Sequence, residues 1–313
     1  MSTLQFLDAD AVSRALRPAD AVQVLRDALA GGLAPERDLR RIAAPVASGE
    51  FLLMPSQSPS AAGVKVITVA PANPARQLPR IQGVYMLFDA DTLAPRAVID
   101  GPALTDLRTA AVSVAAVRDV LRDRPAPLRA VFYGAGPQAA AHLHIILDVV
   151  GDVASATAVV RNPAALPSGH AFDDVLRSGS PEARERTASA GIIVCATTAR
   201  VPLFESELVA DDAVVIAIGS HEADARELPS ALLARADVIV EDVGTALRES
   251  GDVVMAVAEG AITADSLIPL GPLVRGEVAV RGDRPVVFKS SGMSWEDLVL
   301  AEALLARSPQ PGS

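Results

Sequence analysis

Residues 129–142 place a glycine-rich turn between a short apolar run and an alanine-rich helix, and this order constrains the fold more than any other part of the chain. The turn reads Gly134-x-Gly136-x-x-Ala139. In such a turn the first glycine permits a tight bend, the second lets the backbone approach a phosphate, and a small third residue lets the helix pack on the strand. The free N–H groups at the start of the helix then face the anion. The segment therefore predicts a dinucleotide-binding strand–turn–helix unit.

Beyond residue 129, short apolar runs alternate with helical segments. The runs are continuous rather than alternating in polarity, as in parallel strands that are buried on both faces. We expect strands at 130–133, 157–160, 192–196, 213–218, 238–240 and 286–288. This pattern predicts a doubly wound, Rossmann-like α/β domain over residues 123–292.

The first 122 residues carry different signals. Residues 8–31 read as two short helices, the first of them capped by Asp8 or Asp10. Strand-like runs separated by Pro, Ser, Gly and Asn turns follow at 51–54, 64–70, 84–89 and 97–99, as in an antiparallel meander. A helix at 103–120 leads into a stiff Pro-rich linker at 123–127. We expect a smaller α+β domain over residues 1–122 for substrate binding and dimerisation, completed by an amphipathic helix within 293–313.

Composition agrees with an intracellular enzyme. A chain of 313 residues with 50% hydrophobic content is long enough for two cores. Its one cysteine, Cys195, excludes an internal disulfide framework, and His142 and His144 lie on different helix faces, so we expect no metal site. A net charge of −10 without a cationic stripe argues against nucleic acid. The chain opens without a basic and apolar leader and has no apolar run of about 18 residues, so we expect a cytoplasmic protein that does not enter the membrane.

The end of the expected strand at 157–160 bears on the choice of nucleotide. In dinucleotide folds an acidic residue at the end of the second strand binds the ribose 2′-OH, whereas a cation there accommodates a 2′-phosphate. Here Arg161 and Asn162 follow the strand, with no carboxylate, and a guanidinium can fork onto a phosphate. We expect NADP(H) in preference to NAD(H), with NAD(H) left open. The alternative for Arg161 is a solvated loop cation, and nothing indicates a flavin pocket.

The first half carries cations that a catalytic pocket could use, among them Arg41, Lys65 and Arg108. Lys65 is flanked by valines in a strand that should be largely buried, and a buried cation needs an anionic partner or a functional reason. The alternative is a lysine whose head reaches water at a strand edge. Arg108 follows Leu104 by four residues and so lies on a mostly apolar helix face, where it could face a pocket.

Taken in order, several runs of the chain resemble the ornithine cyclodeaminase/mu-crystallin family. They are Leu53-Met54-Pro55, Gly63-Val64-Lys65-Val66, Asn73-Pro74-Ala75-Arg76, Ile81-Gln82-Gly83, Asp100-Gly101, Leu104-Thr105, Arg108-Thr109-Ala110-Ala111 and Gly134-Ala135-Gly136. The resemblance extends over nearly the whole chain, including Ala196-Thr197-Thr198, Gly219-Ser220 and Phe288-Lys289-Ser290.

The resemblance implies a homodimer of two-domain subunits, in which the first domain supplies the dimer contact and the substrate pocket and the second holds NAD(P). It implies that Arg41, Lys65 and Arg108 hold an amino-acid carboxylate, with Lys65 also near the reacting nitrogen. Together with the loop and the strand end, it gives as nucleotide-contacting positions Thr109, Gly134, Gly136, Pro137, Gln138, Arg161, Asn162, Thr197 and Ser291.

Members of this family move a hydride between the α-carbon of an amino acid and the nicotinamide, through an imine. Two positions of this chain depart from the cyclodeaminase pattern: His221 stands where that pattern has an Asp, and Arg80 stands in place of a usual Thr. Without the carboxylate a distal ammonium of the substrate has no obvious anchor, so substrates that lack this amine are favoured. His221 could protonate an imine nitrogen near neutral pH, or be a polar loop residue without a role.

We therefore expect an NAD(P)H-dependent oxidoreductase acting on a small imino or amino acid, with a cyclic ketimine such as pyrroline-2-carboxylate as the favoured substrate. Lys65, or His221 through a water molecule, would supply the proton. This expectation requires the cations of the first half to meet a nicotinamide held by the second half. Two alternatives stay open: an ornithine cyclodeaminase that makes proline and ammonia with a recycled cofactor, and a mu-crystallin-like protein that binds NADP and a small ligand without turnover.

Overall fold

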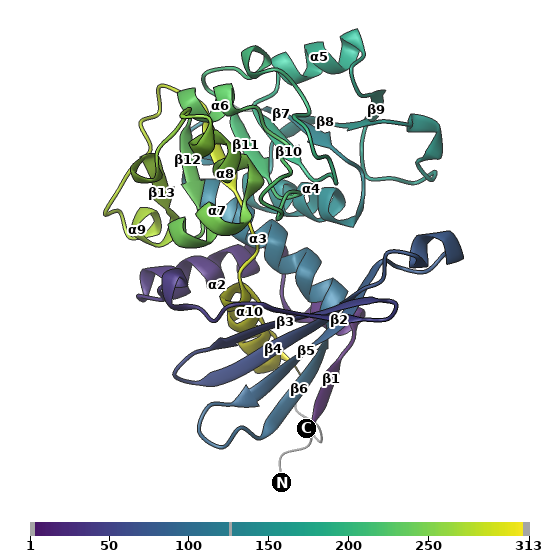
Figure 1. The fold of residues 1–313 in the computed structure, drawn as a ribbon, viewed down its shortest axis with the longest axis vertical. Helices are drawn as coiled ribbons and strands as arrows, with labels where there is room; N and C mark the ends of the chain where they lie inside the picture. The colour runs from purple at the N-terminus through teal and green to yellow at the C-terminus, as the bar shows by residue number, and fades with distance from the viewer. Residues whose placement is uncertain (1–3, 125–126, 309–313) are drawn as a thin grey trace. The chain divides into compact units, whose positions relative to one another are not determined.

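The computed structural model describes residues 4–124 and 127–308, so part of the expected linker lies outside the described residues (Figure 1). The chain divides into two compact units: Met1–Arg108 with Met293–Ser313, and Thr109–Gly292, each as far as it is described. The division falls inside helix α3 (Gly101–Arg122) rather than in the linker after it. The second half of α3 is tied to the second unit, where the Ser113 hydroxyl lies 3.0 Å from the imidazole Nε2 of buried His142.

The first unit is built on a six-stranded sheet of order β1-β6-β5-β4-β3-β2. Its described elements are β1 (Gln5–Leu7), α1 (Ala9–Ala15), α2 (Pro18–Ala30), β2 (Ile42–Val46), β3 (Gly49–Gln57), β4 (Ala61–Val69), β5 (Ile81–Asp89), β6 (Pro95–Asp100) and α10 (Ser294–Arg307). The antiparallel meander predicted from the sequence is present in β3 to β6. Two edge strands were not predicted: β2, antiparallel to β3, and β1, which has three residues and runs parallel to β6.

Helix caps and packing position the elements of this unit. The Asp8 carboxylate accepts a hydrogen bond from the Ala11 N–H at 2.8 Å and caps α1, one of the two positions expected from the sequence. Helix α10 packs across β3, β4 and β5 (Figure 1). Burial alternates along β4, with Lys65 buried and its neighbours Val64 and Val66 half-buried. The sheet therefore has one face under α10 and a second face that is apolar and partly exposed.

The second unit is an eight-stranded parallel sheet of order β13-β12-β14-β11-β10-β7-β8-β9. Its described elements are β7 (Leu128–Tyr133), α4 (Pro137–Val150), β8 (Val153–Val160), β9 (Asp174–Arg177), α5 (Pro181–Ala188), β10 (Ile192–Cys195), β11 (Val214–Ala217), α6 (Ser230–Arg235), β12 (Asp237–Val240), α7 (Val243–Glu249), α8 (Gly251–Ala258), β13 (Leu267–Pro269), α9 (Leu270–Val274) and β14 (Val286–Lys289). The predicted Rossmann-like fold is confirmed. The sheet is wider than predicted, because β9 and β13 extend it at its two edges.

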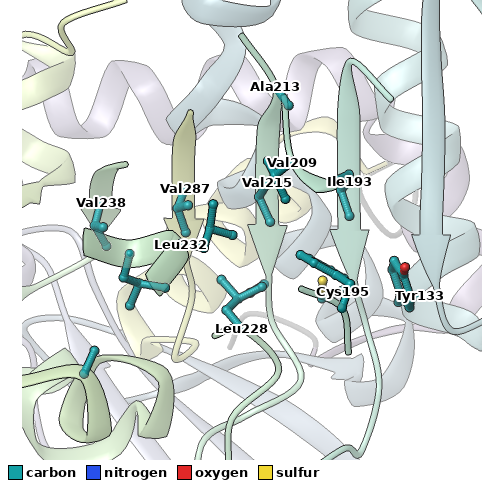
Figure 2. Packing of buried hydrophobic residues seen from close by; sticks show 14 of the residues in the cluster. Tyr133, Ile193, Cys195, Val209, Ala213, Val215, Leu228, Leu232, Val238 and Val287 are labelled. Carbon is teal, nitrogen blue, oxygen red and sulfur yellow. The ribbon is translucent and has the colours of Figure 1, made fainter. Parts of the chain in front are cut away.

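The core of the second unit explains why its strands read as continuous apolar runs. Every residue of β10 and β11 is buried. Ile193 and Val215 project toward one face of the sheet, where Leu228 and Leu232 pack over them (Figure 2). Cys195 lies in the same cluster, and burial raises the pKa of its thiol far above the usual range. The cysteine is therefore an inert part of the core.

The strand order also locates the edge at which this sheet can bind a ligand. Strand β7 lies between β8, which follows it in the chain, and β10, which begins the other half of the sheet. In doubly wound sheets the ligand binds beyond the carboxyl ends of the strands at such a switch point. Across the described residues, no helix combines the length and apolar character that a bilayer crossing demands.

Candidate functional site

The predicted nucleotide loop leaves β7 at Gly134. This residue has a φ of +102°, a conformation that favours glycine, and a Cβ added here would collide with the Ala196 carbonyl oxygen. Gly136 is the N-cap residue of α4, and its Cβ position meets no other atom within 4 Å. Pro137 occupies the first turn, where its missing N–H costs nothing. A phosphate can therefore come close to the first N–H groups of this 14-residue helix, as the pyrophosphate of a dinucleotide requires.

The strand after the loop helix ends as predicted. Arg161 and Asn162 follow β8 directly, and the Arg161 side chain is exposed. Asn162 is the N-cap residue of a short 3₁₀ turn, Pro163–Ala165. The end of β8 thus presents a guanidinium in the position where a carboxylate would select an unmodified ribose.

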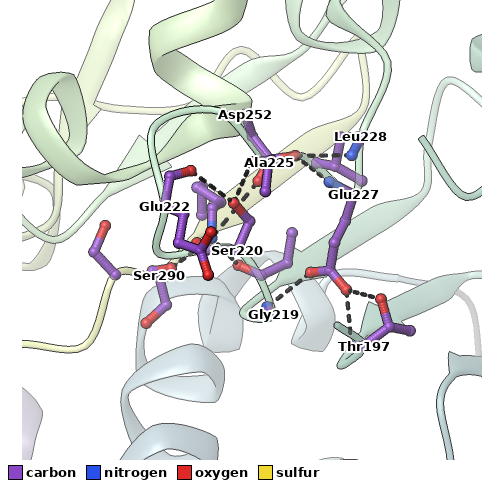
Figure 3. A network of polar contacts seen from close by, with 12 residues as sticks. Thr197, Gly219, Ser220, Glu222, Ala225, Glu227, Leu228, Asp252 and Ser290 are labelled. Atoms are coloured by element: carbon purple, nitrogen blue, oxygen red, sulfur yellow. Dashed lines mark hydrogen bonds and ion pairs between the residues drawn. The ribbon is translucent and has the colours of Figure 1, made fainter. Parts of the chain in front are cut away.

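A buried carboxylate at this edge, Glu227, was missed by the sequence reasoning (Figure 3). Its Oε1 accepts hydrogen bonds from the Thr197 N–H at 2.8 Å and the Thr197 hydroxyl at 2.6 Å, and its Oε2 accepts one from the Gly219 N–H at 2.7 Å. Burial raises the pKa of Glu227, and the bonds from Thr197 oppose this shift. Thr197, expected to contact the nucleotide, directs its only hydroxyl proton to Glu227. A glutamate in an irregular loop carries no periodic signal that would have revealed it.

A second layer of charged side chains holds Glu227 in place. Asp252 of α8 accepts a hydrogen bond from the Glu227 backbone N–H at 2.8 Å. Lys289, the last residue of β14, places its Nζ 3.7 Å from the Asp252 carboxylate and donates to the carbonyls of Ser220 and Ser290, each at 2.7 Å. The ends of β10, β11 and β14 are therefore joined by one buried network (Figure 3).

At three other predicted nucleotide positions a backbone group is fixed by a hydrogen bond to a side chain. The Ser291 N–H donates to the buried Glu241 carboxylate at 2.7 Å. The Thr109 carbonyl accepts a hydrogen bond from Ser113 at 2.8 Å, and the Gln138 carbonyl accepts one from His142 Nδ1 at 2.7 Å. Because His142 also contacts Ser113, it joins α3 to the first turn of α4. Burial lowers the pKa of His142 to about 4, so this imidazole is neutral.

In the first unit, two of the predicted substrate cations come together in a charge cluster made of Lys65, Arg108, Glu296 and Asp297. The Lys65 Nζ lies 2.7 Å from Asp297 Oδ2, and neither side chain is exposed. The Arg108 guanidinium lies 2.9 Å from Glu296 Oε2 and 3.7 Å from Asp297 Oδ1. The acidic partners were not predicted, because adjacent acids in the first turn of a helix are ordinary complements of its dipole.

The fold explains how these side chains meet. Lys65 pairs across the sheet with Met54 on β3 and Tyr85 on β5, the row that α10 covers. Helix α3 begins directly after β6, and the Asp100 carboxylate caps it by accepting the Ala103 N–H at 2.8 Å. Arg108 therefore projects from the second turn of a well-anchored helix. Both cations are positioned by regular elements rather than by loops.

The electrostatics of Lys65 suit a proton donor. Burial and the Arg108 guanidinium lower the pKa of Lys65 to about 8, against the opposing effect of Asp297. The ammonium form dominates at neutral pH, yet it releases its proton more readily than a solvated lysine. An ammonium has three N–H donors, and within the described residues Asp297 is its ion-pair partner. Lys65 therefore has donor capacity for a carboxylate or an imine nitrogen.

Arg41 and His221, the remaining predicted side chains, lie in different units. Arg41 is half-buried directly before β2, and extending the pairing of Ile42 with Leu53 by one residue puts it in the row of Met54 and Lys65. With strands about 4.8 Å apart, its Cα stands about 10 Å from that of Lys65. His221 is exposed in the loop after β11, within the second unit. Among the described residues, no cluster of His, Cys, Asp or Glu could hold a metal ion.

Similarity to known proteins extends over almost the whole chain. A model of the ornithine cyclodeaminase/mu-crystallin family matches residues 11–308. The Δ1-pyrroline-2-carboxylate reductase of Bacillus cereus is 33% identical over 274 residues, 83% of this chain and 82% of the relative. The reductase of the same name from Paracoccus denitrificans is 31% identical over 307 residues, 96% of each chain.

Two solved structures give the same picture of the fold. Thermococcus litoralis Δ1-pyrroline-2-carboxylate reductase in complex with NADH and L-proline has a TM-score of 0.85 at 25% identity, over 97% of each chain. A probable ornithine cyclodeaminase from Bordetella pertussis has a TM-score of 0.82 at 28% identity, over 99% of this chain and 100% of that one.

Proposed function

The chain belongs to the ornithine cyclodeaminase/mu-crystallin family, and from this premise we propose that it is an NAD(P)H-dependent reductase that converts Δ1-pyrroline-2-carboxylate to proline. Relatives at 31–33% identity carry the name of that activity, and a structural neighbour is described with NADH and L-proline. The structural observation that carries the proposal is Lys65, a fully buried ammonium held by Asp297 beside the Arg108 guanidinium.

The charge cluster binds the substrate carboxylate. Lys65 and Arg108 supply charged N–H donors, and Arg41 in the same row adds a third cation. Glu296 and Asp297 fix the cations in place, so that little side-chain entropy is lost when the substrate binds. Because the acids balance the two buried cations, the cluster is stable without substrate.

Reduction of the imine needs a hydride at the ring carbon and a proton at the ring nitrogen. When bound, the reduced nicotinamide supplies the hydride. The Lys65 ammonium gives its proton to the nitrogen, which leaves a neutral amine beside Asp297, and it regains a proton from solvent after product release. The lowered pKa of Lys65 favours this transfer near neutral pH.

We propose that the second unit holds the nucleotide and prefers NADP(H). The N–H groups at the start of α4 bind the pyrophosphate, since Gly136 leaves the approach open and Gly134 permits the tight turn before it. The exposed Arg161 guanidinium binds the 2′-phosphate. His221, exposed beyond β11, is a secondary candidate for a water-mediated proton donor.

The Arg161 assignment predicts a change in nucleotide preference. We expect Arg161→Ala to raise the KM for NADPH by about 10- to 100-fold, the value of a charge-assisted bond, with NADH within about twofold. Arg129→Ala, an exposed arginine at the amino end of β7, is the matched control and should change neither KM. A variant that keeps its preference for NADPH contradicts the assignment.

The function itself is tested by supplying the purified protein with Δ1-pyrroline-2-carboxylate and NADPH or NADH, and in parallel with ornithine and NADP+ or NAD+. We expect oxidation of one nucleotide per proline formed from the imine. Ammonia released from ornithine without net consumption of nucleotide would instead identify a cyclodeaminase. A nucleotide-bound protein that turns over neither compound would identify a binding protein.

We also propose that the protein is a homodimer formed through the sheet of the first unit. Lys65 and Tyr85 project from this sheet toward α10, whereas the opposite face is apolar and includes Ile42, Val46 and Phe51, which are 56%, 47% and 39% exposed. A sheet face with several exposed apolar side chains is typical of a surface that a second copy covers.

A further inference from the structure

We infer that Glu227 is a positioning residue that aligns the two loops carrying the nicotinamide half of the nucleotide. The inference rests on the proposed nucleotide site of the second unit. Glu227 is fully buried, and it stands eight residues after Gly219 in the loop between β11 and α6, from which it reaches across to the loop after β10. Its carboxylate accepts from backbone N–H groups of these loops, whereas the nearby Lys289 ammonium donates to backbone carbonyls.

The strand order shows which loops face the nicotinamide half. The adenosine ribose of a dinucleotide is bound at the end of the strand that follows the loop helix, here β8 with Arg161. The pyrophosphate crosses the turn after β7, so the other half of the nucleotide extends over the strands on the far side, β10 and β11. The loops after these two strands begin at Ala196 and Ile218 and contain Thr197 and Gly219.

Glu227 joins these two loops through opposite ends of one carboxylate. Oε1 accepts the Thr197 N–H and Oε2 accepts the Gly219 N–H. A backbone N–H can only donate, so both oxygens must act as acceptors. The loops are also packed against each other and against the nucleotide turn: a Cβ on Gly219 would collide with the Thr197 carbonyl, and one on Gly134 would collide with the Ala196 carbonyl. A shift of either loop therefore changes the surface beside the pyrophosphate turn.

An amide cannot replace this carboxylate. In Glu227→Gln one end of the side chain becomes an NH₂ group and meets a backbone N–H, so one of the two loops loses its partner. The Glu227 backbone keeps its own support, because Asp252 accepts from its N–H at 2.8 Å. The substitution therefore disturbs loop alignment in particular and leaves the rest of the network intact.

The test compares two nucleotides that differ only in the nicotinamide half. Calorimetry measures the Kd of Glu227→Gln for NADPH and for 2′-phospho-ADP, which keeps the adenosine, the 2′-phosphate and the pyrophosphate. We expect the Kd for NADPH to rise about tenfold or more, the value of one lost buried bond, and that for the fragment to stay within about twofold. Asp237→Asn is the matched control, because this buried carboxylate lies at the amino end of β12 and accepts from the Arg281 N–H. It should change neither Kd.

Three results would overturn the inference. Equal weakening of NADPH and fragment indicates a general structural role, and no weakening of NADPH indicates no role. If the wild-type protein binds neither nucleotide, the proposed function fails together with the inference. Should Glu227→Gln not fold, Thr197→Val removes one of the donors with little change in shape, and we expect about a threefold rise for NADPH with no change for the fragment.

Discussion

The residue that decides most about this protein is Lys65. The sequence contains two lysines, Lys65 and Lys289, and both are fully buried. Lys289 directs its ammonium to the carbonyls of Ala217, Ser220 and Ser290, so it is a structural cation. Lys65 faces a carboxylate, Asp297, and retains donor capacity. The same residue type therefore has a structural role in one unit and a proposed catalytic role in the other.

The role of Lys65 predicts a pH profile. A general acid must be protonated, so with a pKa of about 8 in the free enzyme we expect kcat/KM to fall as the pH rises through this value. Lys65→Met should lower kcat/KM for the imine by about 10²- to 10⁴-fold, the usual contribution of a positioned acid, with the Kd for NADPH within about twofold. A methionine variant of near wild-type rate would remove Lys65 from the mechanism.

The lowered pKa of His142 predicts how the stability of the fold depends on pH. The folded state takes up its proton only below a pH of about 4, whereas the unfolded chain does so below about 6.5, so the unfolded state binds more protons between these values. Stability should therefore fall, by up to about 3 kcal/mol, as the pH drops through this window.

Urea unfolding at pH 7 and pH 5 measures this contribution. The loss between the two pH values should be smaller in His142→Gln than in the wild type, whereas His144→Gln, an exposed histidine on the same helix, should behave as the wild type does. An unchanged loss in His142→Gln contradicts the assignment.

At the scale of elements, features defined by neighbouring residues could be predicted, whereas partners distant in the sequence could not. The turn at Gly134 and the strand ending before Arg161 could be predicted because neighbouring residues define them. The acidic partner Asp297 is brought to Lys65 by a helix from the far end of the chain. Glu227 lies in an irregular loop and contacts the residues that follow β10 and β11. The strands missed at the sheet edges, such as β1, are short and carry little periodicity.

The loop itself can be tested by comparing two glycines with positive φ. Gly134→Ala places a Cβ against the Ala196 carbonyl, so we expect the loop to move and the Kd for NADPH to rise more than about tenfold. Gly151→Ala, at the end of α4, has a similar φ of +81° but open space around its Cβ. It should cost about 1 kcal/mol of stability and leave nucleotide binding unchanged.

At the scale of the whole molecule, the fold class of both units could be predicted from the sequence. The structure divides the two units between Arg108 and Thr109, whereas the sequence analysis placed the boundary after residue 122. Because α3 contributes Arg108 to one unit and Ser113 to the other, a linker rich in proline was a poor guide to where the contacts separate. The roles of the two units, the cytoplasmic location and the individual nucleotide contacts stay predictions.

The homodimer is the prediction that belongs to this scale. We expect sedimentation equilibrium to give a dimer, since a stable interface of about 800 Å² per partner can form on a face of this kind. Phe51→Glu should shift the protein to monomer, whereas Leu147→Glu, a 44% exposed leucine on α4, should not. A monomeric wild type at micromolar concentration would contradict the proposal.

The most direct test of the central claim, that Lys65 binds the substrate carboxylate, is an NMR titration of protein labelled at the lysine side chains. With two lysines in the sequence, Lys65→Met assigns the signals. We predict that the Lys65 signal titrates near pH 8 and that proline raises its pKa, because a carboxylate stabilises the ammonium. A Lys65 signal that titrates as a solvated lysine does, and does not respond to proline, would contradict the account.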